Sequence, residues 1–155
     1  MELAAHLTRP DVRPVVVHDA IELIDQEVAR TNGFSGLAIR SAHRVLTGVR
    51  PGMVGSAVEG LLEPFAERLD PFYQQSLTTG RPLADILVSQ RRAMAEALLS
   101  ITDAKAERTS QATLRRAYLR VRGTARGHVE AAAPGIAALI DAHTPGPHPA
   151  PWIGP

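Results

Sequence analysis

The sequence predicts an all-α protein: a single domain of six or seven helices, packed as an irregular, mostly antiparallel bundle. Apolar residues recur at helical spacing along most of the chain. Proline stands at the head of several of these periodic segments, where its missing N–H and preset φ suit the first helical position. The chain has 155 residues, 45% of them hydrophobic, so it can bury one core without disulfide or metal support.

Two helices are expected before residue 50. Residues 14–31 begin with Pro14 and carry an apolar stripe, and the Asn32-Gly33 pair that follows is typical of a helix end. Ser35 is suited to cap a second helix over residues 35–48.

The middle of the chain predicts two further helices. One begins at Pro51 and has the widest apolar face of the chain, and Pro64 inside it predicts a kink or a break. Asp70 and Pro71 form a typical cap and first residue for a short helix that ends at Gly80.

The last three helices are expected at residues 82–101, 110–133 and 136–143. Gln90 is a polar residue inside the apolar series of the first of them. The Pro134-Gly135 pair separates the other two, because proline cannot continue a helix.

Composition limits the domain organisation, the compartment and the chemistry. We expect residues 1–143 to form the helical domain, and residues 144–155, with five prolines, to form a Pro-rich extended or disordered tail. The N-terminal residues show no secretory signal pattern, and no segment reaches the ~18 apolar residues of a membrane span. The absence of cysteine excludes disulfides and thiolate chemistry. We therefore expect a cytoplasmic protein with no membrane span.

The formal net charge of +1 hides a gradient along the chain. Residues 1–80 carry seven Arg against ten Asp and Glu, or −3. Residues 81–155 carry ten Lys and Arg against six acids, or +4. The acidic half of one copy could therefore meet the basic half of another.

Arginines form a line on the helix at residues 110–133. Arg115, Arg122 and Arg126 align beside its apolar stripe, an arrangement that could hold phosphates. No aromatic residue interleaves with them and the net charge is close to zero, so we do not expect nucleic-acid binding. We expect their stems to cover the core, with the guanidinium groups in water or paired with acids of residues 14–31.

No common catalytic motif is present, since GxSxG, GxGxxG, HExxH and P-loop patterns are all missing from the sequence. His18 and Glu22 lie one helical turn apart and could share a metal ion. A pair of ligands is short of the three or four that a protein metal site needs. The sequence therefore predicts no metal site and no cofactor.

Two groups of residues are candidates for ligand binding. The polar group lies between the last long helices and consists of Asp103, Arg108, Arg115, Tyr118 and Arg122. The apolar group surrounds the expected corner at Asp70 and consists of Phe65, Phe72 and Tyr73. The competing interpretation is structural, with the charges paired to one another and the aromatic rings filling the core.

Two surfaces are candidates for association. Gly123 and Gly127 lie one turn apart outside the apolar stripe, where they could allow the close approach of another helix. Glu59, Glu63 and Glu67 form a ladder opposite the apolar face of their helix, which is typical of a solvated face or of an electrostatic contact.

Several blocks of the sequence resemble a family of small all-helical actinobacterial proteins that is known only as a domain of unknown function. The blocks are SGLAIRSAHRVLTGVRPGMV, LLEPFAERLDPFY, EALLSITDAKAERTS and LRRAYLRVRGTARGHVEAAAPGIAALIDAH. The resemblance covers about residues 8–144. It implies a cytoplasmic, all-helical protein from a GC-rich bacterium, and it implies no activity and no site residues.

Our first functional hypothesis is a non-enzymatic helical protein that associates with itself, as a homodimer, or with another protein. The alternative is a protein that binds a small apolar molecule or lipid in a pocket between helices. A third, weaker hypothesis is an enzyme with an unfamiliar polar site between Asp103 and Tyr118. A cavity of several hundred Å³ would favour the second, and convergent polar groups with perturbed pKa values would favour the third.

Overall fold

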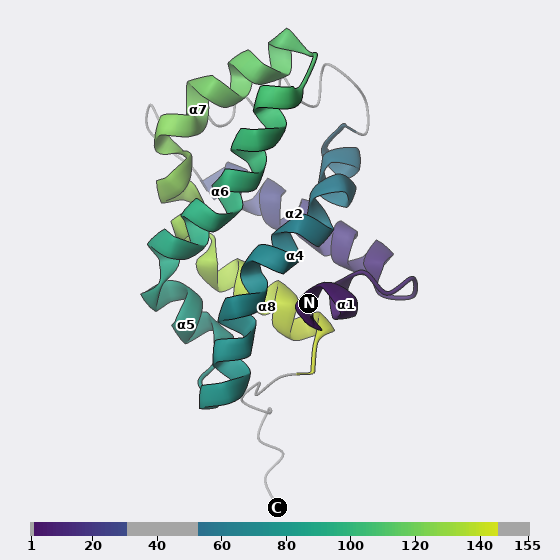
Figure 1. The fold of residues 1–155 in the computed structure, drawn as a ribbon, viewed down its shortest axis with the longest axis vertical. Coiled ribbons are helices and arrows are strands. Elements are labelled where there is room, and N and C mark those ends of the chain that lie inside the picture. Colours follow the sequence, from purple (N-terminus) through teal and green to yellow (C-terminus); the bar gives the residue numbers. More distant parts are fainter. Residues whose placement is uncertain (1, 31–52, 146–155) are drawn as a thin grey trace, which may run out of the picture.

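The computed structural model describes residues 2–30 and 53–145, and these ranges are helical apart from short turns (Figure 1). Their seven helices are α1 (Glu2–Leu7), α2 (Arg13–Arg30), α4 (Met53–Thr79), α5 (Leu83–Ser89), α6 (Arg91–Arg108), α7 (Ala112–Ala131) and α8 (Ala133–His143). The predicted all-α class is confirmed. The helix predicted at residues 35–48 lies outside the described residues.

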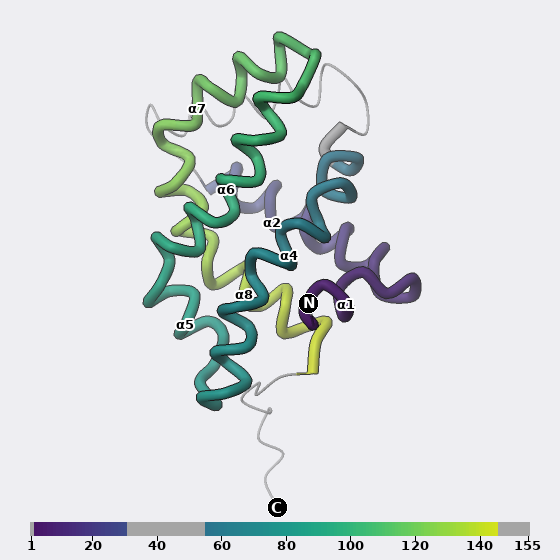
Figure 2. Tube along the Cα trace, viewed as in Figure 1, coloured from purple at the N-terminus to yellow at the C-terminus, as the bar shows by residue number. Residues whose placement is uncertain are grey.

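Helix α4 organises the fold. It contacts α1, α2, α5 and α6, while α8 packs against α1, α2 and α5. Helices α6 and α7 form an antiparallel pair that reaches one end of the molecule, as the tube in Figure 2 shows. One cluster of buried side chains draws on α1, α2, α4, α5, α6 and α8, so the described residues share a single core.

The N-terminal helix α1 is not predicted by the sequence. Its Leu3, Ala4 and Leu7 side chains are buried. The carboxylate of Asp70 on α4 accepts a hydrogen bond of 2.9 Å from the backbone N–H of Leu3. Because the first N–H groups of a helix lack partners within it and carry partial positive charge, this buried carboxylate caps α1. Asp70 therefore caps a helix distant in sequence, and not one that starts at Pro71.

The predicted break in the middle of the chain is wrong, because α4 runs continuously through Pro64 and Pro71. A proline inside a helix leaves the carbonyl four residues earlier without its donor. Here those carbonyls belong to Gly60 and Glu67, which are both exposed. Water can bind the carbonyls that the prolines leave free, so packing of the opposite face is enough to keep the helix continuous.

The helix predicted at residues 82–101 is in fact two, α5 and α6, which meet at Gln90. The φ and ψ of Gln90 are −113° and 27°, outside the helical region. Its side-chain amide donates a hydrogen bond of 2.8 Å to Oε1 of Gln75 on α4. The polar residue inside the apolar series thus marks a turn between two helices.

The other boundaries agree closely with the sequence. Helix α2 covers residues 13–30, where the sequence predicts 14–31. Helix α7 covers residues 112–131, within the predicted 110–133. Pro134 lies in the first turn of α8, and Gly80, with a φ of 72°, follows the end of α4. No helix in the described ranges is long and apolar enough to cross a membrane.

The first two residues of the predicted tail pack with the domain. Thr144 is 7% exposed and its hydroxyl donates a hydrogen bond of 2.8 Å to the Ile140 carbonyl. The Pro145 carbonyl accepts a hydrogen bond from the hydroxyl of Tyr73. Residues 146–155 lie outside the described part of the chain.

Candidate functional site

A cavity of about 780 Å³ lies between α2, α4, α6 and the junction of α7 with α8. Most of its lining is apolar and includes Leu23, Ile24, Leu61, Phe65, Leu99 and Ile136. The polar residues of the lining are Glu27, Arg30, Thr102 and His128. Small-molecule sites in proteins are mostly apolar clefts of about 300–1,000 Å³ with a few polar groups, so this cavity is the main candidate site.

The cavity explains an unevenness in the burial of α2. Val16 and Val17, near the start of the helix, are 0% and 8% exposed. Ile24 and Val28 continue the same predicted apolar stripe, but they are only half-buried and line the cavity. Val16 borders the cavity at its fully buried end, whereas Ile24 and Val28 border it where the helix is less covered.

The three aromatic candidates do not form one site. Phe65 lines the cavity, whereas Phe72 is half-buried against the core. Tyr73 is 2% exposed, and its ring meets that of His6 edge to face, with centroids 6.3 Å apart. The expected corner does not exist because α4 continues past Asp70. Phe65 and Phe72 therefore lie about two turns apart along one helix, and Tyr73 lies about 100° around the helix from Phe72.

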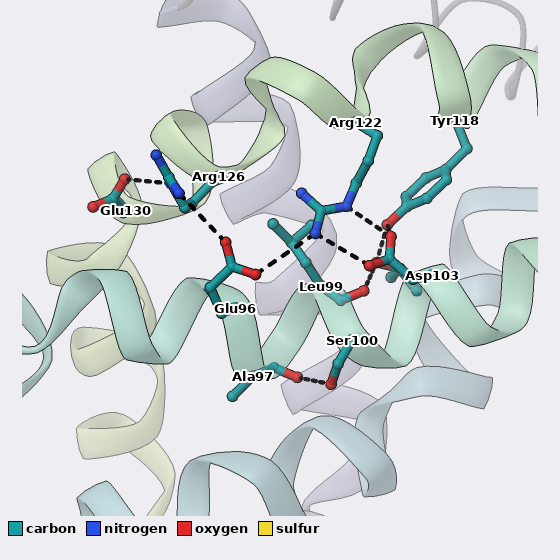
Figure 3. Close-up of polar contacts among 10 residues, drawn as sticks. Glu96, Ala97, Leu99, Ser100, Asp103, Tyr118, Arg122, Arg126 and Glu130 are labelled. Carbon is teal, nitrogen blue, oxygen red and sulfur yellow. Dashed lines mark hydrogen bonds and ion pairs between the residues drawn. The ribbon is translucent and has the colours of Figure 1, made fainter.

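Three of the polar candidates converge between α6 and α7 (Figure 3). The guanidinium of Arg122 donates two hydrogen bonds to the carboxylate of Asp103, from Nε at 2.7 Å and from Nη2 at 3.1 Å. The hydroxyl of Tyr118 donates a third, at 2.5 Å. Oγ1 of Thr102, a residue that lines the apolar cavity, lies 2.7 Å from the Tyr118 hydroxyl. This cluster therefore borders the cavity.

The hydrogen bonds of the Asp103 cluster join α6 to α7, and the pKa shifts of its members suit a structural role. Its hydrogen bonds with Arg122 lower the pKa of Asp103. Burial, together with the bond to Asp103, raises the pKa of Tyr118 to about 12. General acid–base catalysis works best with a pKa near the working pH, and both of these shifts lead away from neutrality. The cluster therefore gives no support to acid–base chemistry between Asp103 and Tyr118.

The other two polar candidates lie apart from this cluster. Nε of Arg115 donates a hydrogen bond of 3.2 Å to the Ala106 carbonyl, and its guanidinium also binds the carbonyl of Thr109. Arg115 therefore holds the turn between α6 and α7. Arg108 is exposed at the end of α6.

The line of arginines on α7 is paired within the chain. Arg122 and Arg126 each lie 3.7 Å from a carboxylate oxygen of Glu96 on α6, and Arg126 lies 3.7 Å from Glu130 one turn along α7 (Figure 3). The expected partners on α2 are wrong, because α7 packs against α6 and its guanidinium groups meet the acids of that neighbour. These are partly exposed pairs, each worth about 0–1 kcal/mol.

Comparison with known proteins identifies the family but no activity. The profile of a family of unknown function, DUF6918, matches residues 3–144. The chain belongs to DUF6918. No curated protein and no solved structure matches it. The matched residues include the whole lining of the cavity and the Asp103 cluster of this DUF6918 protein.

For this DUF6918 protein, Asp103→Asn is expected to lower the free energy of unfolding at pH 7 by about 1 kcal/mol, because the side chain is 38% exposed and water screens the pair. The folded pKa of Asp103 lies below its unfolded value. The contribution is therefore complete above about pH 4 and is lost as the pH falls through the folded pKa. Urea denaturation at pH 7 and at successively lower pH should show the two proteins converging.

The control for this comparison is Glu107→Gln, which neutralises an exposed carboxylate on the same helix. It should leave the stability within about 0.5 kcal/mol of the wild type. A gap between Asp103→Asn and the wild type that stays constant down to low pH would show that the Arg122 pair does not stabilise the fold.

Proposed function

We propose that this protein binds a small apolar molecule, of the size and character of a fatty-acyl chain, in the cavity between α2, α4, α6 and the α7–α8 junction. The observation that carries the proposal is the cavity itself, about 780 Å³ with a mostly apolar lining. Its few polar residues suit the common pattern of a ligand site, in which a small number of polar groups orient a mostly apolar ligand.

The energetics support an occupant. Protein interiors are close-packed and contain few voids larger than a water molecule. This cavity is partly open to solvent, so water reaches its apolar walls, and each Å² of apolar surface left in contact with water costs about 25 cal/mol. Water solvates aliphatic walls poorly, and an apolar ligand removes this cost.

The test is a titration of the delipidated full chain with laurate and, separately, with the fluorescent apolar probe 1-anilinonaphthalene-8-sulfonate. Ala20 lines the cavity, and Ala20→Phe fills part of it. This variant is expected to weaken the binding of both probes by about tenfold or more while keeping the melting temperature or raising it. Ala29→Phe places the same ring on the exposed face of the same helix and should change neither quantity.

Native mass spectrometry of the protein as purified gives a second readout. An additional mass that organic solvent removes, and that Ala20→Phe abolishes, supports the proposal. Equal probe binding by wild type, Ala20→Phe and Ala29→Phe overturns it. So does the absence of binding by the wild type, the result expected if residues of the chain itself fill the cavity.

A second candidate function is self-association through the outer face of α7. Leu119 is 61% exposed, the highest exposure of any large hydrophobic side chain in the described residues. A Cβ added to Gly123 or Gly127 would meet nothing within 4 Å, so this face is open. Glu59, Glu63 and Glu67 are exposed on α4 as predicted, which leaves an acidic face for a basic partner surface.

Analytical ultracentrifugation at micromolar concentration tests this second candidate. The wild type is expected to sediment as a dimer and Gly123→Leu as a monomer, because the larger side chain keeps the partner helix away. Ala138→Leu, a similar enlargement on the exposed face of α8, should remain dimeric. A monomeric wild type excludes the homodimer, and a dimeric Gly123→Leu removes α7 from the interface.

A further inference from the structure

We propose that His18, Asp19 and Glu22, on one turn of α2, form a binding site for a divalent transition-metal ion such as Zn²⁺. The site is separate from the apolar cavity, whose lining includes none of the three residues. One ligand atom from each residue lies within 4.8 Å of the other two. An imidazole nitrogen and two carboxylate oxygens are a donor set suited to zinc, with water completing the shell.

The geometry is close to that of a bound ion. Ligand atoms about 2.0–2.1 Å from a tetrahedral metal lie roughly 3.3 Å from one another. Nε2 of His18 and Oε1 of Glu22 are already 3.1 Å apart. The atoms of all three residues lie within 4.8 Å of one another, and rotation of the exposed His18 and Glu22 side chains can bring them to Asp19. The four-residue spacing of His18 and Glu22 did not predict Asp19 as a third ligand, because Asp19 is adjacent to His18 and adjacent residues of a helix do not share a face.

Contact between α2 and α8 fixes the third ligand. Oδ2 of Asp19 lies 2.6 Å from Nε2 of His143, whose side chain is 13% exposed. Metal-bound carboxylates are commonly held by a second hydrogen bond, which orients the remaining oxygen toward the ion. His143 is thus a positioning residue, and a bound ion would reinforce the contact between α2 and α8.

The charge around the site favours a cation. Residues 14–29 carry four carboxylates and no Lys or Arg. His18 and Glu22 have side chains 69% and 59% exposed, so an ion reaches them without any opening of the fold. An imidazole in the donor set favours zinc, nickel or copper over magnesium or calcium, which prefer oxygen ligands alone.

The experiment is isothermal titration calorimetry of the metal-stripped, tag-free full chain with ZnCl₂. The wild type is expected to bind one Zn²⁺ with micromolar affinity, and His18→Ala and Glu22→Gln are expected to weaken this binding by about tenfold or more. The matched control is Glu2→Gln. Glu2 and His6 are also a glutamate and a histidine four residues apart, at 3.8 Å, but no third ligand groups with them among the described residues.

Glu2→Gln should bind Zn²⁺ as the wild type does, and His143→Ala should bind it more weakly than the wild type but more tightly than His18→Ala. Circular dichroism confirms that each variant is folded, and MgCl₂ in place of ZnCl₂ should give no heat at the same concentration. Binding that survives in both His18→Ala and Glu22→Gln overturns the proposal, because the ion then lies at other histidines of the chain. The absence of micromolar binding by the wild type overturns it as well.

Discussion

Val121→Asp is expected to unfold the protein or to lower its free energy of unfolding by more than about 4 kcal/mol. Val121 lies on α7 and is 8% exposed, and the main packing partner of α7 among the described helices is α6. A carboxylate introduced there would be buried, and burial of a charge without a partner is among the most destabilising changes in a protein core. Urea denaturation followed by circular dichroism measures the loss.

Arg116→Ala is the control on the same helix. Arg116 is exposed on the other side of α7, so its removal should change the stability by less than about 0.5 kcal/mol. Similar losses for the two variants would mean that α7 does not bury the face assigned to it. Val121→Ala separates the loss of volume from the burial of a charge. It removes volume without adding charge, so it should lower the free energy of unfolding by roughly 1–3 kcal/mol.

The inward faces of the long helices could be predicted because periodicity is a local property of the sequence. Val121 and Ala125 on α7, and Met94 and Leu98 on α6, are buried as their spacing predicts. The N-terminal helix α1 could not be predicted, because six residues are too few to show a period and its cap, Asp70, comes from another helix.

Proline and polar residues misled the prediction where tertiary contacts decide the outcome. Proline is a common first residue of a helix, yet Pro71 lies inside α4. Glu67, whose carbonyl loses its donor, is an exposed residue, so water can bind there. Gln90 was only one polar residue in an apolar series, yet it marks the boundary between α5 and α6. Its side-chain amide binds Gln75 on α4. Local propensity alone does not distinguish these two cases.

The candidate sites divide in the same way. Asp103, Tyr118 and Arg122 converge because α6 and α7 are consecutive and antiparallel, so a prediction that placed them near one turn could succeed. The cavity depends on how α2, α4, α6 and α8 pack, and only the wide apolar face of α4 hinted at it. Asp19, the third ligand of the proposed metal site, could be recognised only from the side-chain positions on α2, which the sequence does not give.

Tyr73→Ala is expected to cost about 3–5 kcal/mol, which is a large part of the stability of a domain of this size. Tyr73 is the largest of the fully buried side chains in the described residues. Its ring packs in the core beside His6, and its hydroxyl binds the Pro145 carbonyl at the C-terminal end of the fold. Thermal and urea denaturation should both show the loss.

Two milder changes separate the ring from the hydroxyl. Tyr73→Phe keeps the ring and should cost about 0.5–1.5 kcal/mol, the usual worth of one hydrogen bond. A chain that ends at His143 lacks the acceptor and the buried Thr144 and should be destabilised as well, whereas a chain that ends at Pro145 keeps both contacts and should match the full-length protein. In the chain that ends at His143, Tyr73→Phe should cost nothing further, because its partner is already missing. An equal cost of Tyr73→Phe in the two truncated chains would show that Pro145 does not tie the end of α8 to α4.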